Sequence, residues 1–203
     1  MSSLGSREKQ LLLEVARRAL ITAAELRESL ENLPQDTELG ESTGAFVTLH
    51  YRGRLRGCIG QIGSGQLLLE VVAYCAKSAA LEDPRFDPVR PDELGEIEIE
   101  LSVLSPLEEI APDRIEAGKH GLMVSRGWQR GVLLPQVAIE YRWAAGRFLE
   151  ETCLKAGFER DAWREPGTKI HCFTAEVFRE SDFRSGQRPG QEGRARSRYS
   201  IST

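Results

Sequence analysis

The chain has 203 residues and a mass of 22.7 kDa, and its 40% hydrophobic content is enough for a folded core in one large or two small domains. The net charge of -4 hides an asymmetry, because residues 184–203 hold five arginines and one glutamate while the preceding 183 residues carry -8. An acidic body argues against a general nucleic-acid binder, which needs a basic face for phosphates. The C-terminal segment 184–203 is rich in Arg, Gly, Ser and Gln, and its composition predicts disorder.

Cysteine usage indicates a cytoplasmic protein with reduced thiols. The sequence contains no C-x-x-C pair and no metal-like spacing of its cysteines with its three histidines. It also shows no signal peptide and no apolar run long enough to cross a membrane. We therefore expect no bound metal, no cofactor and no membrane contact.

The hydrophobic pattern predicts helices and strands in an alternating order. Apolar residues spaced three and four apart predict a helix at 6–31, and a turn signal, "YRGR", at 51–54 predicts two paired strands around it. A second helix is expected at 66–81. Residues 97–104, "IEIELSVL", alternate apolar and polar side chains as a half-buried strand does.

One part of the first hairpin is echoed later in the chain. "RGRLRGCIGQ" at 52–61 resembles "RGWQRGVLLPQ" at 126–136, and each is preceded by a short strand and followed by a helix and a strand. The flanking segments are 45–51, 66–81 and 94–104 for the first copy, and 121–125, 137–156 and 169–179 for the second. Chance matching of Arg-Gly turns is the alternative to a degenerate duplication. The pattern predicts an α+β fold with largely antiparallel sheets, covering helices and two subdomains built from related hairpin, helix and strand units.

Cys58 is the first candidate for chemistry. The glycines around it, Gly57, Gly60, Gly63 and Gly65, precede a predicted helix, where main-chain amides can bind an anion and lower a thiol pKa. Arg56 lies two residues away, so on a regular strand it shares a face with Cys58. The alternative is that the glycines serve turns and that Cys58 packs as a small apolar residue.

Other polar residues are candidates for completing such a site. His120 is the preferred base for Cys58, because it lies at the beginning of the hairpin that corresponds to the Cys58 hairpin. His50 and His171 are the alternative bases. Glu98 and Glu100 share one strand face, which is either solvated or paired with the arginines of the first hairpin. The amides of Gln61 and Gln136 are candidate binding groups, and Trp128, at the second hairpin tip, is expected to form a contact surface.

Six blocks of the sequence together resemble the AMMECR1 domain family. They are "LRGCIG" at 55–60, "AALEDPRFDPV" at 79–89, "IEIELSVLSP" at 97–106, "GKHGLMV" at 118–124, "GVLLPQVAIEYRW" at 131–143 and "FLEETCLKAGF" at 148–158. The resemblance covers residues from about 8 to 180 in family order. It implies one AMMECR1 domain over residues 6–183, with a larger and a smaller subdomain and the LRGCIG segment at or near a cleft between them.

The resemblance also implies a biological context. Such proteins are similar to component A of the three-part AmmeMemoRadiSam system, encoded with a Memo-like protein and a radical SAM protein. This chain lacks the Cys-x-x-x-Cys-x-x-Cys cluster of a radical SAM enzyme, so iron-sulfur chemistry would belong to the partner. By motif match, the site residues carried over are Arg56, Gly57, Cys58, His120 and Gln136, without an established reaction.

Two functions of different classes fit these observations. In the first, the chain is an enzyme or enzyme component of a modification or redox system, with Cys58 as nucleophile or redox thiol, His120 as base and Arg56 at an anion site. In the second, it is a non-catalytic adaptor or ligand-binding module in which Trp128 matters more than Cys58. Nucleic-acid binding through the arginine-rich tail is the weakest hypothesis.

Overall fold

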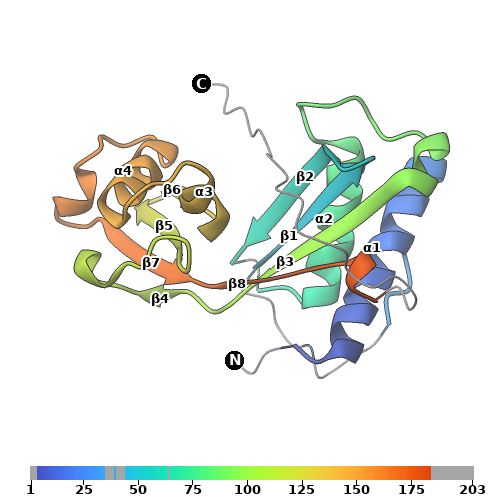
Figure 1. Ribbon diagram of the computed structural model, residues 1–203, viewed down its shortest axis with the longest axis horizontal. Helices are drawn as coiled ribbons and strands as arrows, with labels where there is room; N and C mark the ends of the chain where they lie inside the picture. Colours follow the sequence, from blue (N-terminus) through green and yellow to red (C-terminus); the bar gives the residue numbers. More distant parts are fainter. Residues whose placement is uncertain (1–3, 35–38, 40–43, 64, 184–203) are drawn as a thin grey trace. The chain divides into compact units, whose positions relative to one another are not determined.

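The computed structural model describes residues 4–34, 39, 44–63 and 65–183, and it confirms an α+β fold with two antiparallel sheets (Figure 1). Residues 104–175 form one compact unit, and the described residues before and after them form the other. Each unit has its own hydrophobic core. The segment 184–203, for which composition predicts disorder, lies outside the described residues.

The first unit packs two helices against one face of a four-stranded sheet with the order β2-β1-β3-β8 (Figure 1). Side chains alternate along β1, so Ala45, Val47 and Leu49 join the helices in the core while the residues between them face the other way. The elements of this unit are α1 (Ser6–Leu26), β1 (Gly44–Tyr51), β2 (Arg54–Ile62), α2 (Leu68–Leu81), β3 (Ile97–Leu104) and β8 (Ala175–Arg179), with 3-10 turns η1 (Pro91–Glu96) and η4 (Glu180–Phe183).

The second unit is smaller and has a sheet with the order β4-β7-β5-β6. Its core lies between this sheet and α4, and Phe148, Leu149 and Leu122 are among its most buried side chains. The elements are β4 (Glu108–Glu109), β5 (Gly121–Arg126), β6 (Gln129–Leu133), α3 (Pro135–Glu140), α4 (Ala145–Lys155) and β7 (Lys169–Phe173), with 3-10 turns η2 (Pro112–Arg114) and η3 (Ala162–Arg164).

The two units share one topology, as the sequence echo predicts. In each, a hairpin is followed by helix, and the next long strand returns to pair antiparallel with the first strand of the hairpin, giving β2-β1-β3 in one sheet and β6-β5-β7 in the other. The residues of the two Arg-Gly motifs therefore occupy corresponding hairpins.

Several predicted boundaries were wrong for local reasons. The strand predicted at 94–104 begins at Ile97, because Pro91–Glu96 forms the 3-10 turn η1. The first helix ends at Leu26 rather than 31, because Arg27 adopts a left-handed conformation with φ 60°. The predicted helix 137–156 is two helices, separated at Arg142, whose φ is 53°. The predicted strand 169–179 divides at Thr174, whose main-chain N–H donates to Ser105 Oγ and whose carbonyl accepts from the Ser105 N–H, both at 2.9 Å.

Candidate functional site

A row of polar side chains crosses the helix-free face of the first sheet. Thr48, on β1, pairs directly with Cys58 on β2 and with Glu100 on β3. Its neighbours Val47 and Leu49 point into the helix-covered core, so Thr48 and its two partners project from the opposite face. Thr48 is only 5% exposed, which makes this a sheltered polar row rather than a solvated strand face.

The Cys58 thiol is partly buried and hydrogen-bonded from one side. Thr48 Oγ1 donates to Cys58 Sγ at 3.3 Å. Burial raises the pKa of the thiol, and the Thr48 hydroxyl and the positive charge of Arg85 oppose that rise without cancelling it. The expected lowering of this pKa by glycine amides is therefore wrong: at neutral pH Cys58 is a protonated thiol.

Asp83 holds the main chain of Cys58 in place. β2 is an edge strand, so the Cys58 N–H points away from the sheet, and it donates to Asp83 Oδ2 at 2.8 Å. The same carboxylate accepts from Nη2 and Nε of the Arg85 guanidinium at 2.7 and 2.9 Å, and that Nη2 also donates to the Cys58 carbonyl at 3.4 Å. Burial raises the pKa of Asp83, but these hydrogen bonds outweigh it and the net shift is downward.

Glu100 ends the polar row as a fixed carboxylate. Arg179 on β8 donates to Glu100 Oε2 through Nε at 2.6 Å, and its terminal nitrogen lies 2.5 Å from the same oxygen. His50 Nε2 lies 3.7 Å from that oxygen, on the same face of β1 as Thr48. Burial alone would raise the pKa of Glu100, whereas His50 and Arg179 lower it more strongly, so Glu100 is an anion at neutral pH.

Arg56 does not lie beside the thiol as regular strand spacing predicted. A bulge places one extra residue in β2, because Leu49 pairs with Gly57 and His50 pairs with Leu55, which leaves Arg56 unpaired. Its guanidinium turns to Glu93, with two hydrogen bonds of 2.8 and 2.9 Å, and to the Asp87 carbonyl at 2.9 Å. Three of the five N–H groups of Arg56 are therefore used by Glu93 and the Asp87 carbonyl, and the side chain ties β2 to η1.

The glycines on either side of Cys58 are required by close packing. A Cβ at Gly57 would lie 2.1 Å from the carbonyl oxygen of Ala79 in α2, and a Cβ at Gly60 would lie 2.1 Å from the ring of Phe46. Because successive residues of a strand point to opposite faces, Gly57 lets α2 approach one face of β2, and the Cys58 side chain lies on the other face. For these two glycines the structure supports the packing interpretation.

The expected anion loop is not supported at the start of α2. Gly63 and Gly65 have positive φ angles of 65° and 66°, as tight turns require, but the Leu67 N–H at the helix start donates to Glu70 Oε2 at 3.2 Å. A carboxylate at a helix N-terminus takes the place of an external anion. Gln61 is held by its side-chain N–H donating to Gln66 Oε1 at 3.2 Å.

Three predicted site residues belong to the second unit. His120 Nδ1 accepts a hydrogen bond of 3.1 Å from the main-chain N–H of Glu116, and Gln136 lies in the first turn of α3 with a buried Oε1 that has no partner among the described residues. Trp128 is fully exposed at the hairpin tip. The approach of His120 or Gln136 to Cys58 stays a prediction.

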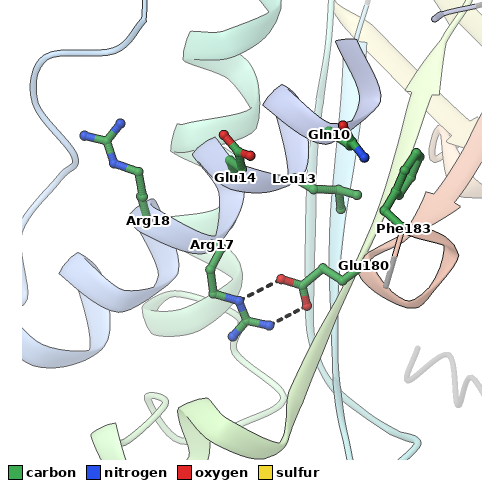
Figure 2. Close-up of a pocket in the computed structure, with 7 residues that line it drawn as sticks. All are labelled: Gln10, Leu13, Glu14, Arg17, Arg18, Glu180 and Phe183. Atoms are coloured by element: carbon green, nitrogen blue, oxygen red, sulfur yellow. Dashed lines mark hydrogen bonds and ion pairs between the residues drawn. The ribbon is translucent and has the colours of Figure 1, made fainter. Parts of the chain in front are cut away.

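A hollow of about 650 Å³ is lined by residues of α1 and η4 (Figure 2). Its central feature is a paired contact between the Arg17 guanidinium and the Glu180 carboxylate. Arg17 also donates to the carbonyls of Leu94 and Ile97, so its role is to tie α1 to the sheet. The lining residues are Gln10, Leu13, Glu14, Arg17, Arg18, Glu180 and Phe183.

Two further observations concern metals and membranes. Within the described ranges, no three His, Cys, Asp or Glu side chains are grouped so that they could hold a metal ion. In the same ranges, no helix has both the length and the apolar character needed to span a bilayer.

Sequence patterns did not predict four residues that the structure places at the site, namely Thr48, Asp83, Arg85 and Arg179. Asp83 and Arg85 were visible as charges inside the proline-rich stretch "EDPRFDP", which signals a loop that packs on something specific. Thr48 and Arg179 gave no signal, because their importance comes only from strand pairing.

Comparison with known proteins places these features in a family. The AMMECR1 family model matches residues 13–178. A protein from Thermococcus gammatolerans is 48% identical over 160 residues, covering 72% of this chain and 78% of that protein, and one from Methanothermobacter thermautotrophicus is 42% identical over 182 residues, covering 85% and 94%. The crystal structure of the uncharacterized protein PH0010 from Pyrococcus horikoshii matches with a TM-score of 0.71 and 39% identity, over 83% of this chain and 89% of that one. The chain belongs to the AMMECR1 family.

Proposed function

We propose that this protein is the thiol-bearing component of a modification or redox system and that Cys58 forms a transient covalent bond with an electrophile. The observation that carries the proposal is the polar row Cys58, Thr48 and Glu100, in register across three strands. A cysteine that served only as packing would not need a hydroxyl aimed at its sulfur or a charged carboxylate beside that hydroxyl.

The main chain of the nucleophile is fixed before any substrate arrives. Asp83 and Arg85 bond the N–H and the carbonyl of Cys58, so the main chain that carries the thiol is held in place, and Thr48 bonds the sulfur itself. Preorganisation of this kind lowers the entropic barrier of a displacement step. It supports a role for the sulfur atom itself rather than for the loop around it.

The chemical step follows from the protonation states. Because the thiol is protonated at rest, its proton passes to the His50 and Glu100 pair as the sulfur forms a bond with the electrophilic carbon or sulfur. The leaving group departs with the electron pair of the broken bond and takes up that proton. His50 is the general base in this scheme because it shares a strand face with the row; His120 is the alternative base that the sequence favours.

Family resemblance supplies the proposed partners, a Memo-like protein and a radical SAM protein. The proposal is tested by co-expressing this chain with both partners from one genome and measuring the intact mass of the purified chain. We expect an added mass on the wild-type protein and on the matched buried-cysteine control Cys75→Ala, and none on Cys58→Ser. An added mass that persists on Cys58→Ser, or no added mass on any of the three proteins, would overturn the proposal.

A non-catalytic adaptor is the second candidate, and the exposure of Trp128 favours it. A fully exposed indole at a hairpin tip is typical of a contact residue. The two functions separate in the same co-expression: an adaptor keeps both partners bound in Cys58→Ser and loses them in Trp128→Ala, whereas a thiol component loses its added mass in Cys58→Ser with its partners still bound.

A further inference from the structure

The second sheet ends in a strand whose outer edge is open. β6 is the last strand in the order β4-β7-β5-β6, and a two-residue turn, Gly127 and Trp128, joins it to β5. In such a hairpin the pair next to the turn exchanges both main-chain hydrogen bonds, so Arg130 and Val132 direct their N–H and C=O groups away from β5. Across residues 104–175, these outward groups have no hydrogen-bond partner.

The corresponding strand of the first sheet is bonded at one of its outward-facing residues. β2 occupies the same place in its sheet as β6, and its outward N–H and C=O at Cys58 are bonded by Asp83 and Arg85. Exposed edge strands are normally covered or blocked, because their unpaired groups recruit other strands. The outward groups of Arg130 and Val132 on β6 have no such bonds within residues 104–175, which makes this edge a candidate binding feature.

The side chains around the open edge are cationic and aromatic. Arg130 projects from the face opposite α4, while Lys155 ends α4 close to Gly131, where a Cβ would lie 2.6 Å from the Lys155 carbonyl carbon. Both side chains are exposed, and neither has a carboxylate partner within the described second unit. Trp128 stands fully exposed in the turn that precedes the same strand.

We propose that the outer edge of β6 binds an extended acidic segment of a partner protein as an added strand. Main-chain pairing with Arg130 and Val132 supplies affinity, and the cations on the two faces select acidic side chains. Trp128 provides an apolar anchor at one end. The site is independent of Cys58 chemistry, and it gives the adaptor function a defined class of partner.

The test uses a fluorescein-labelled peptide, Glu-Glu-Val-Thr-Val-Glu-Glu, whose acidic residues fall on both faces of a strand. Its matched control has the same sequence and charge but carries N-methyl groups at alternate residues, which removes the donors needed for pairing. Binding is measured by fluorescence anisotropy, and amide hydrogen exchange is followed by NMR. We expect saturable binding of the unmodified peptide only, with slowed exchange at the Arg130 and Val132 amides.

Protein variants complete the test. Arg130→Glu should weaken binding by about tenfold or more, and Trp128→Ala should weaken it by a smaller factor. Val132→Pro removes an outward N–H without breaking a bond to β5 and should abolish binding; where it lowers thermal stability, the N-methylated peptide gives the same information. Cys58→Ser should bind as the wild type does. Equal binding of the two peptides, no change in Arg130→Glu, or no saturable binding at millimolar peptide would overturn the proposal.

Discussion

The main-chain N–H of Cys58 donates a hydrogen bond of 2.8 Å to the carboxylate of Asp83, a residue 25 positions further along the chain. This contact joins the edge of β2 to the loop that follows α2. Through Arg85, the same loop also reaches the Cys58 carbonyl. The candidate nucleophile is thus fixed by a loop, and its own strand alone does not determine its position.

Replacement of Asp83 by alanine should destabilise the protein. The change leaves the Cys58 N–H without its acceptor beside a buried position and removes the carboxylate that pairs with Arg85, and such a loss costs about 2 kcal/mol of the free energy of unfolding. Urea unfolding measures it. The matched control is Asp92→Ala, whose carboxylate pairs with Arg90 on the surface and should change the free energy little. Equal effects of the two changes would contradict the assigned role of Asp83.

The contribution of the Asp83 charge should depend on pH. Its pKa in the folded protein is lowered from the ordinary value of 3.8, so the charge stabilises the fold above that value and the contribution is lost as the pH falls through the folded pKa. Asp83→Asn keeps one oxygen for the Cys58 N–H, and it removes the charge together with one acceptor of Arg85. The difference in free energy of unfolding between wild type and Asp83→Asn should be constant near neutral pH and shrink below about pH 4. A difference that grows on acidification would refute this assignment.

Periodicity predicted those parts of the fold that local pattern determines. The strand 97–104 was placed correctly, and its alternation put Glu98 and Glu100 on the face away from the core. The echo of the two Arg-Gly motifs predicted the shared topology of the sheets. The alternation and the repeated motif can both be recognised from the order of residues along the chain, without knowledge of strand pairing.

The contacts of the site depend on which strands pair and in which register, and the local residue pattern does not determine either. We expected the arginines of the first hairpin to pair with Glu100. Its arginine partner is instead Arg179 on β8, which lies 79 positions further along the chain. The bulge that turns Arg56 toward Glu93 follows from strand register, which one sequence does not reveal. The pKa of Cys58 is raised and not lowered as expected, because burial of the thiol outweighs the Thr48 hydrogen bond and the positive charge of Arg85.

Alkylation of Cys58 by iodoacetamide should report its raised pKa. The rate should increase with pH and show its inflection above the ordinary thiol value of 9.0. Thr48→Val removes the hydroxyl that stabilises the sulfur anion, so the inflection should move higher and the rate at pH 8 should fall by about threefold or more. Cys58→Ser provides the background from the other cysteines. An inflection near neutral pH would contradict the protonated resting state.

Gly57→Ala tests the close contact that allows Cys58 to occupy its face of β2. The added methyl group would meet the Ala79 carbonyl oxygen at 2.1 Å, so α2 must move, and we expect a loss of about 3 kcal/mol in the free energy of unfolding. Gly146→Ala, where a Cβ meets no atom within 4 Å, is the control, and in α4 it should leave stability unchanged or raise it by about 0.5 kcal/mol. Both values come from thermal or urea unfolding. Because α2 packs against β2 at this position, Gly57→Ala should also change the alkylation rate of Cys58, whereas Gly146→Ala should not; an unchanged rate in a destabilised Gly57→Ala protein would show that the sulfur is positioned by Asp83 and Arg85 alone.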